Sequence, residues 1–296
     1  MNNRIFVRLE ERGILSVAGP DRRTFLQGLI SNDVNKVDES RAIYSGFLTA
    51  QGRFLHDFFL VEIGDVFYLD GEAARLDDLR RRLSLYKLRA KVTLAVDDSM
   101  AVVALLGPGT HAALGLPEDR GSARPFQGGI VYVDPRHAGL GARAILPKDR
   151  IDALARTGFA PGRFEDYDRL RLSLGVPDGS RDMPVEKALL LESGFDELDG
   201  IDWKKGCYIG QELTARMKYR ALVKKRLMPV RIDGPVPPPG TPVMLDDQDA
   251  GEMRSAADTI GLALLRLDMV EQADKEGRPL RAGDAQLTPV NPPRET

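Results

Sequence analysis

The sequence has few of the residues that build metal centres and disulfides. Its 296 residues include one cysteine, Cys207, and three histidines. A single cysteine excludes an intramolecular disulfide, and so few soft ligands cannot form a self-contained zinc or iron–sulfur site. A free thiol also suits a reducing compartment best. The scarcity raises the question of what one thiol does in this protein.

Long apolar runs and an excess of one charge are also absent. No stretch approaches ~20 consecutive apolar residues, and the amino-terminal segment lacks the apolar core of a signal peptide. The 42 basic and 44 acidic side chains give a formal net charge of −2, which provides no global attraction to nucleic acid or membranes. We therefore predict a soluble, cytoplasmic protein without a membrane partner, in which local patches recognise any charged partner.

The apolar patterns predict strands and helices in an irregular order. Residues 4–19 alternate apolar and polar side chains around Gly13, which predicts a hairpin, and residues 42–71 predict three strands with turns at 51–52 and 64–65. Helical spacing follows Asp21, a potential cap, and recurs at 72–89, 149–156, 164–174 and 211–220. Because regular βαβ units are missing, we predict the α+β class.

The sequence pattern changes beyond residue 222. Short strand-like runs such as "IGLALLRLD" alternate there with turn clusters such as "GPVPPPG" and "DDQDAG". This pattern is typical of a compact all-β domain of about 70 residues.

The segment "KKGCYIGQELTAR", residues 204–216, contains the only cysteine. Gly206 and Gly210 flank "CYI", so Cys207 is predicted in a loop just before a helix amino terminus, with Lys204 and Lys205 beside it. Positive charge and exposed amides favour a thiolate, which predicts a reactive or ligand-forming cysteine. A small buried residue under a loop is the alternative, since free cysteine is among the most buried residue types.

The same region carries an unusual charge bias. Between Trp203 and Arg226 the sequence has eight positive side chains and one negative side chain, Glu212. The bias fits either a solvated helix face or a site for an anionic partner such as a carboxylate tail, a phosphate or RNA. Glu212 and Arg216 also have the i,i+4 spacing of a helical ion pair. Residues 75–91 form a second basic stretch, diluted by two aspartates.

"KKGCYIGQE" resembles the K-G-C-Y-x-G-Q-E motif of the YgfZ family, folate-binding proteins implicated in iron–sulfur enzyme maturation. The resemblance extends in order through "GPDRRTFLQGLISNDV", "YSGFLTAQGRFLHDFFL", "YKLRAKV", "DPRHAGLGAR" and "GLALLR". It implies the fold of the glycine-cleavage aminomethyltransferases, with two interleaved α+β domains and a carboxy-terminal β-barrel around a central folate-binding cavity. The implied domains are 1–48 with 102–163, 49–101 with 164–222, and 223–296.

The resemblance also implies site residues. Asp57, in "QGRFLHD", stands where the transferases have their catalytic aspartate, and His56 replaces its acidic neighbour, while "DPRHAGLGAR" lacks the acid of the transferases' folate-contacting turn. Asp57 and Glu192 would bind pterin N–H groups, and either Arg171 or the Lys/Arg cluster of residues 204–226 would bind the glutamate carboxylates of folate. A surface acid or a solvated ion pair is the alternative for each. The motif adds Lys205 beside Cys207 as catalytic and Tyr208, Gln211, Glu212 and Arg216 as cofactor-binding residues.

The resemblance therefore implies a tetrahydrofolate-binding accessory factor that supports assembly or repair of iron–sulfur clusters in client enzymes. Cys207 would be a functional thiolate, and partners would supply the other cluster ligands, because one thiolate cannot hold a cluster. Whether Cys207 acts by ligation or by redox chemistry is open. A folate-dependent aminomethyl or one-carbon transferase and a tRNA-modification factor are the alternatives.

Overall fold

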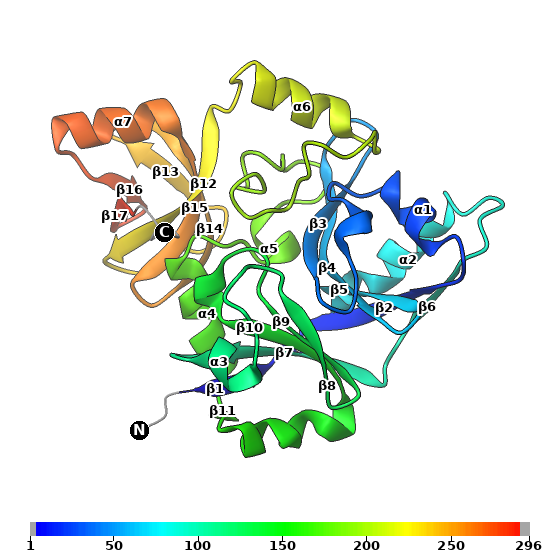
Figure 1. Ribbon diagram of the computed structural model, residues 1–296. Helices are drawn as coiled ribbons and strands as arrows, with labels where there is room; N and C mark the ends of the chain where they lie inside the picture. The colour runs from blue at the N-terminus through cyan, green and yellow to red at the C-terminus, as the bar shows by residue number, and fades with distance from the viewer. Residues whose placement is uncertain (1–3, 291–296) are drawn as a thin grey trace.

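The computed structural model describes residues 4–290, which form two sheets and a barrel (Figure 1). The first sheet has the strand order β11 (Ala160–Pro161), β1 (Ile5–Arg8), β7 (Met100–Leu106), β10 (Ala142–Pro147), β9 (Gly129–Val133), β8 (Ala123–Phe126). The second has the order β3 (Ile43–Leu48), β4 (Phe54–Ile63), β5 (Val66–Glu72), β2 (Arg12–Ala18), β6 (Thr93–Val96). Six strands close the barrel: β12 (Lys225–Asp233), β15 (Ile260–Arg266), β14 (Gln248–Ala257), β13 (Pro242–Leu245), β16 (Leu280–Ala282), β17 (Ala285–Pro289).

The chain interleaves the two sheets, since β1 lies in the first, β2 to β6 in the second, and β7 to β11 in the first again. The predicted α+β class with a carboxy-terminal barrel is confirmed. The hairpin predicted for residues 4–19 is wrong, because β1 and β2 belong to different sheets. The backbone N–H of Leu9 still bonds Val102 in the first sheet, and the chain then turns into the second.

Sheet pairing also departs from the domain boundary predicted at residue 48. β3 pairs with β4 through a tight turn at residues 49–52, so both strands belong to the second sheet together with β2. Local hairpin closure is the physical reason, because a short turn places consecutive strands side by side. Residues 12–48 therefore contribute strands to the second sheet rather than to the first.

The helices connect and cover these sheets (Figure 1). They are α1 (Arg22–Gln27), α2 (Leu76–Ser84), α3 (Thr110–Leu114), α4 (Phe164–Ser173), α5 (Gly179–Asp182), α6 (Gln211–Tyr219) and α7 (Leu267–Glu276), with a long 3-10 helix at Lys148–Thr157. Asp21 does not cap α1; its carboxylate accepts from the backbone N–H of Lys91 at 2.7 Å. α7, which covers one side of the barrel, was not predicted. Among the described residues, no helix is long and apolar enough to cross a membrane.

Candidate functional site

The segment that carries Cys207 is fixed to the chain that follows α1. The hydroxyl of Ser31 donates to the carbonyl of Gly200 at 2.6 Å, and the side-chain amide of Asn32 donates to Asp199 at 2.7 Å. On the other side of the cysteine, the N–H of Ile209 donates to Gly28 at 3.1 Å. The segments "GLISND" and "DWKKGCYIG" are therefore in contact, although about 170 residues separate them in sequence.

Two charged side chains shape the loop itself. Asp202 accepts from the backbone N–H groups of Lys204 and Lys205 at 2.6 and 2.9 Å, and it pairs with Lys36 at 2.7 Å. The buried ammonium of Lys205 donates to the carbonyls of Ile30 and Asn32 at 2.6 and 2.7 Å. Burial lowers the pKa of Lys205 to about 8. Lys205 thus holds the loop through backbone carbonyls.

Two glycines explain how the motif meets the β3–β4 turn. Gly52 and Gly210 both have left-handed backbones, with φ of +79° and +80°. A Cβ at Gly52 would lie 2.8 Å from the carbonyl oxygen of Gly210, and one at Gly210 would lie 2.5 Å from that of Thr49. Only glycine fits such a backbone-to-backbone contact. The contact sets the position at which α6 begins.

Cys207 is exposed on this fixed loop. The interpretation of Cys207 as a small buried residue is therefore wrong. The side chains that pack beneath the loop are those of Lys205 and Tyr208. Tyr208 is buried, its ring centre lies 5.2 Å from the Lys205 ammonium, and burial raises its pKa to about 12. Among residues 4–290, no group of three or more potential ligands is placed to hold a metal ion.

The remaining motif residues lie at or on α6. Gln211 begins the helix and is half-buried, whereas Glu212 and Arg216 are exposed. The predicted i,i+4 ion pair between Glu212 and Arg216 does not form. Both side chains are consequently available at the surface, as is Cys207.

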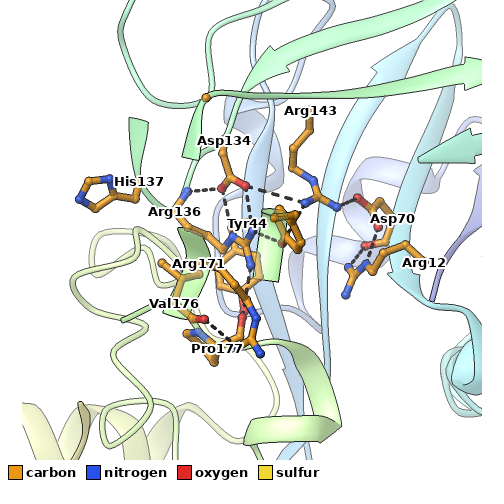
Figure 2. A network of polar contacts seen from close by, with 12 residues as sticks. Arg12, Tyr44, Asp70, Asp134, Arg136, His137, Arg143, Arg171, Val176 and Pro177 are labelled. Carbon is orange, nitrogen blue, oxygen red and sulfur yellow. Dashed lines mark hydrogen bonds and ion pairs between the residues drawn. The ribbon is translucent and has the colours of Figure 1, made fainter. Parts of the chain in front are cut away.

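A separate polar network fills the junction between the two sheets (Figure 2). Asp70, on β5, bonds Arg12 at 2.7 Å and Arg143 at 2.6 Å, and all three side chains are buried. Asp134 forms a second buried pair with Arg136 at 2.8 Å. Although burial opposes it, Arg12 and Arg143 lower the pKa of Asp70, so the carboxylate is charged.

One aromatic ring organises this network. The guanidinium carbons of Arg143, Arg136 and Arg12 lie 4.0, 4.7 and 5.6 Å from the ring centre of Phe59, a cation–π arrangement. Asp57 lies at the edge, where the hydroxyl of Tyr44 donates to it at 3.0 Å. Burial raises the pKa of Asp57, against the opposing effect of Arg12.

The space enclosed by the arginines of the junction is small. The space lined by Arg12, Phe59, Arg136, Arg143 and Asp178 holds about 10 Å³. Pockets for small ligands typically hold about 300–1,000 Å³, whereas about 10–15 Å³ is the room of one water. The guanidinium groups of Arg136 and Arg143, which lie over the ring of Phe59, take up most of the room at this point of the junction.

The other predicted folate contacts lie apart from Asp57. Arg171 is fully buried and donates to Asp168, Asp182 and Ser255 at 2.7, 2.6 and 2.7 Å, which ties α4 and α5 to the barrel. Glu192 lines a groove of about 310 Å³ beside the barrel, and burial raises its pKa. His56 is buried and shares a 3.0 Å hydrogen bond with Asp78 of α2. The predicted residues therefore form several clusters rather than one site.

Known proteins share this architecture. A model of the amino-terminal domain of GCVT matches residues 9–120, and a model of the CAF17 carboxy-terminal beta-barrel domain matches residues 224–294. The crystal structure of the glycine cleavage system aminomethyltransferase T from Bartonella henselae superposes with a TM-score of 0.77 at 15% identity, covering 98% of this chain and 85% of that one. The protein thus has the aminomethyltransferase fold.

Relatives with higher identity define the family within that class. The chain is 35% identical to mitochondrial iron–sulfur cluster assembly factor IBA57 of Mus musculus, over 89% of this chain and 78% of that protein. For the Homo sapiens protein of the same name the identity is 37%, over 87% and 76%. The chain belongs to the IBA57 family of iron–sulfur cluster assembly factors. The predicted cytoplasmic location is contradicted, because these relatives are mitochondrial by name.

Proposed function

We propose that the protein supplies Cys207 as one ligand of an iron–sulfur cluster that it shares with a partner protein. The exposure of the sole cysteine on a fixed loop carries this proposal. Cluster iron is bound by thiolates, so Cys207 releases its proton to solvent and its sulfur bonds iron. A single thiolate leaves the remaining ligand positions to the partner. The family membership supports a role in cluster assembly, and a relation to the YgfZ proteins is part of the proposal.

The fixed loop is what suits Cys207 to ligation. Asp202, Lys205 and the Gly52–Gly210 contact hold the backbone on both sides of the thiol, so little conformational freedom is lost when sulfur binds iron. The small space at the junction gives no support to a reaction step that uses tetrahydrofolate. An aminomethyltransferase mechanism would need Asp57 to reach a bound folate, and Asp57 is buried against Tyr44.

The test replaces the thiol and then moves it. In cells that lack the protein, Cys207→Ser and Cys207→Ala should abolish maturation of a [4Fe–4S] enzyme such as aconitase, with thermal unfolding unchanged. The matched control, Cys207→Ser/Ser99→Cys, places an exposed thiol on a distant turn and should not restore maturation. Wild-type maturation with Cys207→Ser, or rescue by the relocated thiol, would overturn the proposal.

A further inference from the structure

The surface beside Cys207 carries positive charge that the protein does not neutralise. Lys204, Arg216, Lys218 and Arg220 are exposed, and none of them forms an ion pair within residues 4–290. We call these four side chains, with Tyr219 and Leu222, the α6 face. On α2, by contrast, the exposed Arg80 and Arg81 pair with Asp77 and Asp78.

The α6 face is continuous with the cysteine loop. The inner side of α6 is buried at Thr214 and Met217, and its outer side is covered by no other element (Figure 1). The ammonium of Lys218 lies 3.7 Å from the ring centre of Trp203, at the start of the loop that carries Cys207. This cation–π contact joins helix and loop into one surface. A partner that binds the α6 face is therefore close to the thiol.

Two apolar side chains lie among these charges. Tyr219 is 74% exposed and Leu222 is 42% exposed. Aromatic anchors with arginines around them are the usual composition of the energetic centre of a protein–protein interface. Binding of single-stranded RNA relies on stacking platforms of several aromatic rings. Here only Tyr219 presents an open ring, because Lys218 covers one face of Trp203.

We infer that the α6 face is the docking surface for an acidic protein, which contributes the remaining ligands of the cluster at Cys207. This inference rests on the proposed function and adds the chemistry of the partner to it. The net charge of the whole chain is −2, so attraction of an acidic protein must come from this local patch. The four cations steer the partner and fix its orientation, while Tyr219 and Leu222 provide the desolvated contact.

The test places a photo-crosslinker on the α6 face of the full chain. Tyr219→p-benzoylphenylalanine is expressed in cells that lack the protein, and the crosslinked species are identified by mass spectrometry and by nuclease digestion. The same chain is then made with Arg216→Glu/Arg220→Glu, with the conservative Arg216→Lys/Arg220→Lys, and with Arg80→Glu/Arg81→Glu. The last is the matched control, because it makes the same change of charge on α2.

We expect a crosslink to an acidic, cysteine-containing protein. Its yield and the maturation of aconitase should both fall about 10-fold with Arg216→Glu/Arg220→Glu and stay within about 2-fold for the lysine variant and the α2 control. A crosslink to RNA, an equal loss in the α2 control, or an unchanged yield in the Arg216→Glu/Arg220→Glu chain would overturn the inference.

A further variant separates this inference from the proposed function. Cys207→Ser combined with the crosslinker should retain the crosslink and lose maturation, because docking uses the α6 face and ligation uses sulfur. If Cys207→Ser matures aconitase normally, the proposed function fails, whatever the crosslink shows. If Cys207→Ser loses maturation while Arg216→Glu/Arg220→Glu retains it, the docking surface is wrong and the ligand role stands.

Discussion

The junction between the two sheets and the α6 face use the same kind of side chain in opposite ways. At the junction, Arg12 and Arg143 are buried and share the carboxylate of Asp70. On the α6 face, Arg216 and Arg220 are exposed and have no carboxylate within the described chain. Buried charges must be paired for the fold to be stable, whereas unpaired surface charges leave interaction energy for a partner. The arginines of the junction therefore stabilise the fold, whereas those of the α6 face remain available at the surface.

The largest effect is expected at the junction. Asp70→Asn removes the negative charge between Arg12 and Arg143 and leaves two buried guanidinium groups without their shared carboxylate. Breaking a buried ion pair from one side typically costs about 3–5 kcal/mol, so the free energy of unfolding in urea should fall by that amount. A loss well below this range would show that the junction tolerates unpaired buried cations, as the surface does.

The matched control is an exposed pair of the same chemistry. Asp77 pairs with Arg80 at 3.0 Å on the surface of α2. Solvent screens such pairs, so Asp77→Asn should leave the urea midpoint nearly unchanged. The folded Asp70→Asn and Asp77→Asn variants should both keep the exposed thiol of Cys207. Titration with a chromogenic disulfide reagent checks this.

A pH effect of about 3 kcal/mol is expected from His56, which lies beneath α2. Burial lowers the pKa of His56 from 6.5 to about 4. Below pH 6.5 the unfolded chain therefore takes up a proton that the folded chain resists, and stability falls as the pH drops from 6.5 to about 4. A depression of that size corresponds to a loss of about 3 kcal/mol across this window.

Urea unfolding at pH 7, 5.5 and 4 measures this loss against His56→Gln. The glutamine keeps a donor for Asp78 without a titrating ring, so the variant should lose about 3 kcal/mol less than the wild type on acidification. Parallel pH curves for the two proteins would count against a buried neutral histidine. Arg216, on the α6 face, is exposed. The stability of Arg216→Gln should therefore depend on pH as that of the wild type does.

Local patterns predicted the parts of the structure that depend on neighbours in sequence. The glycines around Cys207, the start of α6 and the turn at 51–52 follow from short-range rules, and each is present. The role of Lys205 could not be predicted, because its acceptors are backbone carbonyls about 175 residues away, and any residue supplies a carbonyl. The pairs of Asp70 with Arg12 and Arg143 likewise cross 58 and 73 residues.

The sequence contains charged residues of the junction that the family resemblance did not identify. "DPRHAGLGAR" contains Asp134, Arg136 and Arg143, and the missing acid of the transferase turn was interpreted as a loss. In the structure the guanidinium groups of Arg136 and Arg143 lie over the ring of Phe59 and fill the space beside it. The family fold was predictable from motifs, but the volume of its centre depended on how three distant arginines pack.

The smallest expected effect is that of tetrahydrofolate itself. Binding at the junction would require Arg143 to leave Asp70, at the cost of a buried ion pair, before a space of about 10 Å³ could admit a pterin. A conformational penalty of about 3 kcal/mol weakens affinity by roughly 100-fold. Isothermal calorimetry with the full chain and tetrahydrofolate should therefore show no binding at micromolar concentrations, with a glycine-cleavage aminomethyltransferase as the positive control. A micromolar Kd that is lost in Asp57→Asn would show instead that the arginines yield to the ligand, and the centre would then join the α6 face as a surface open to partners.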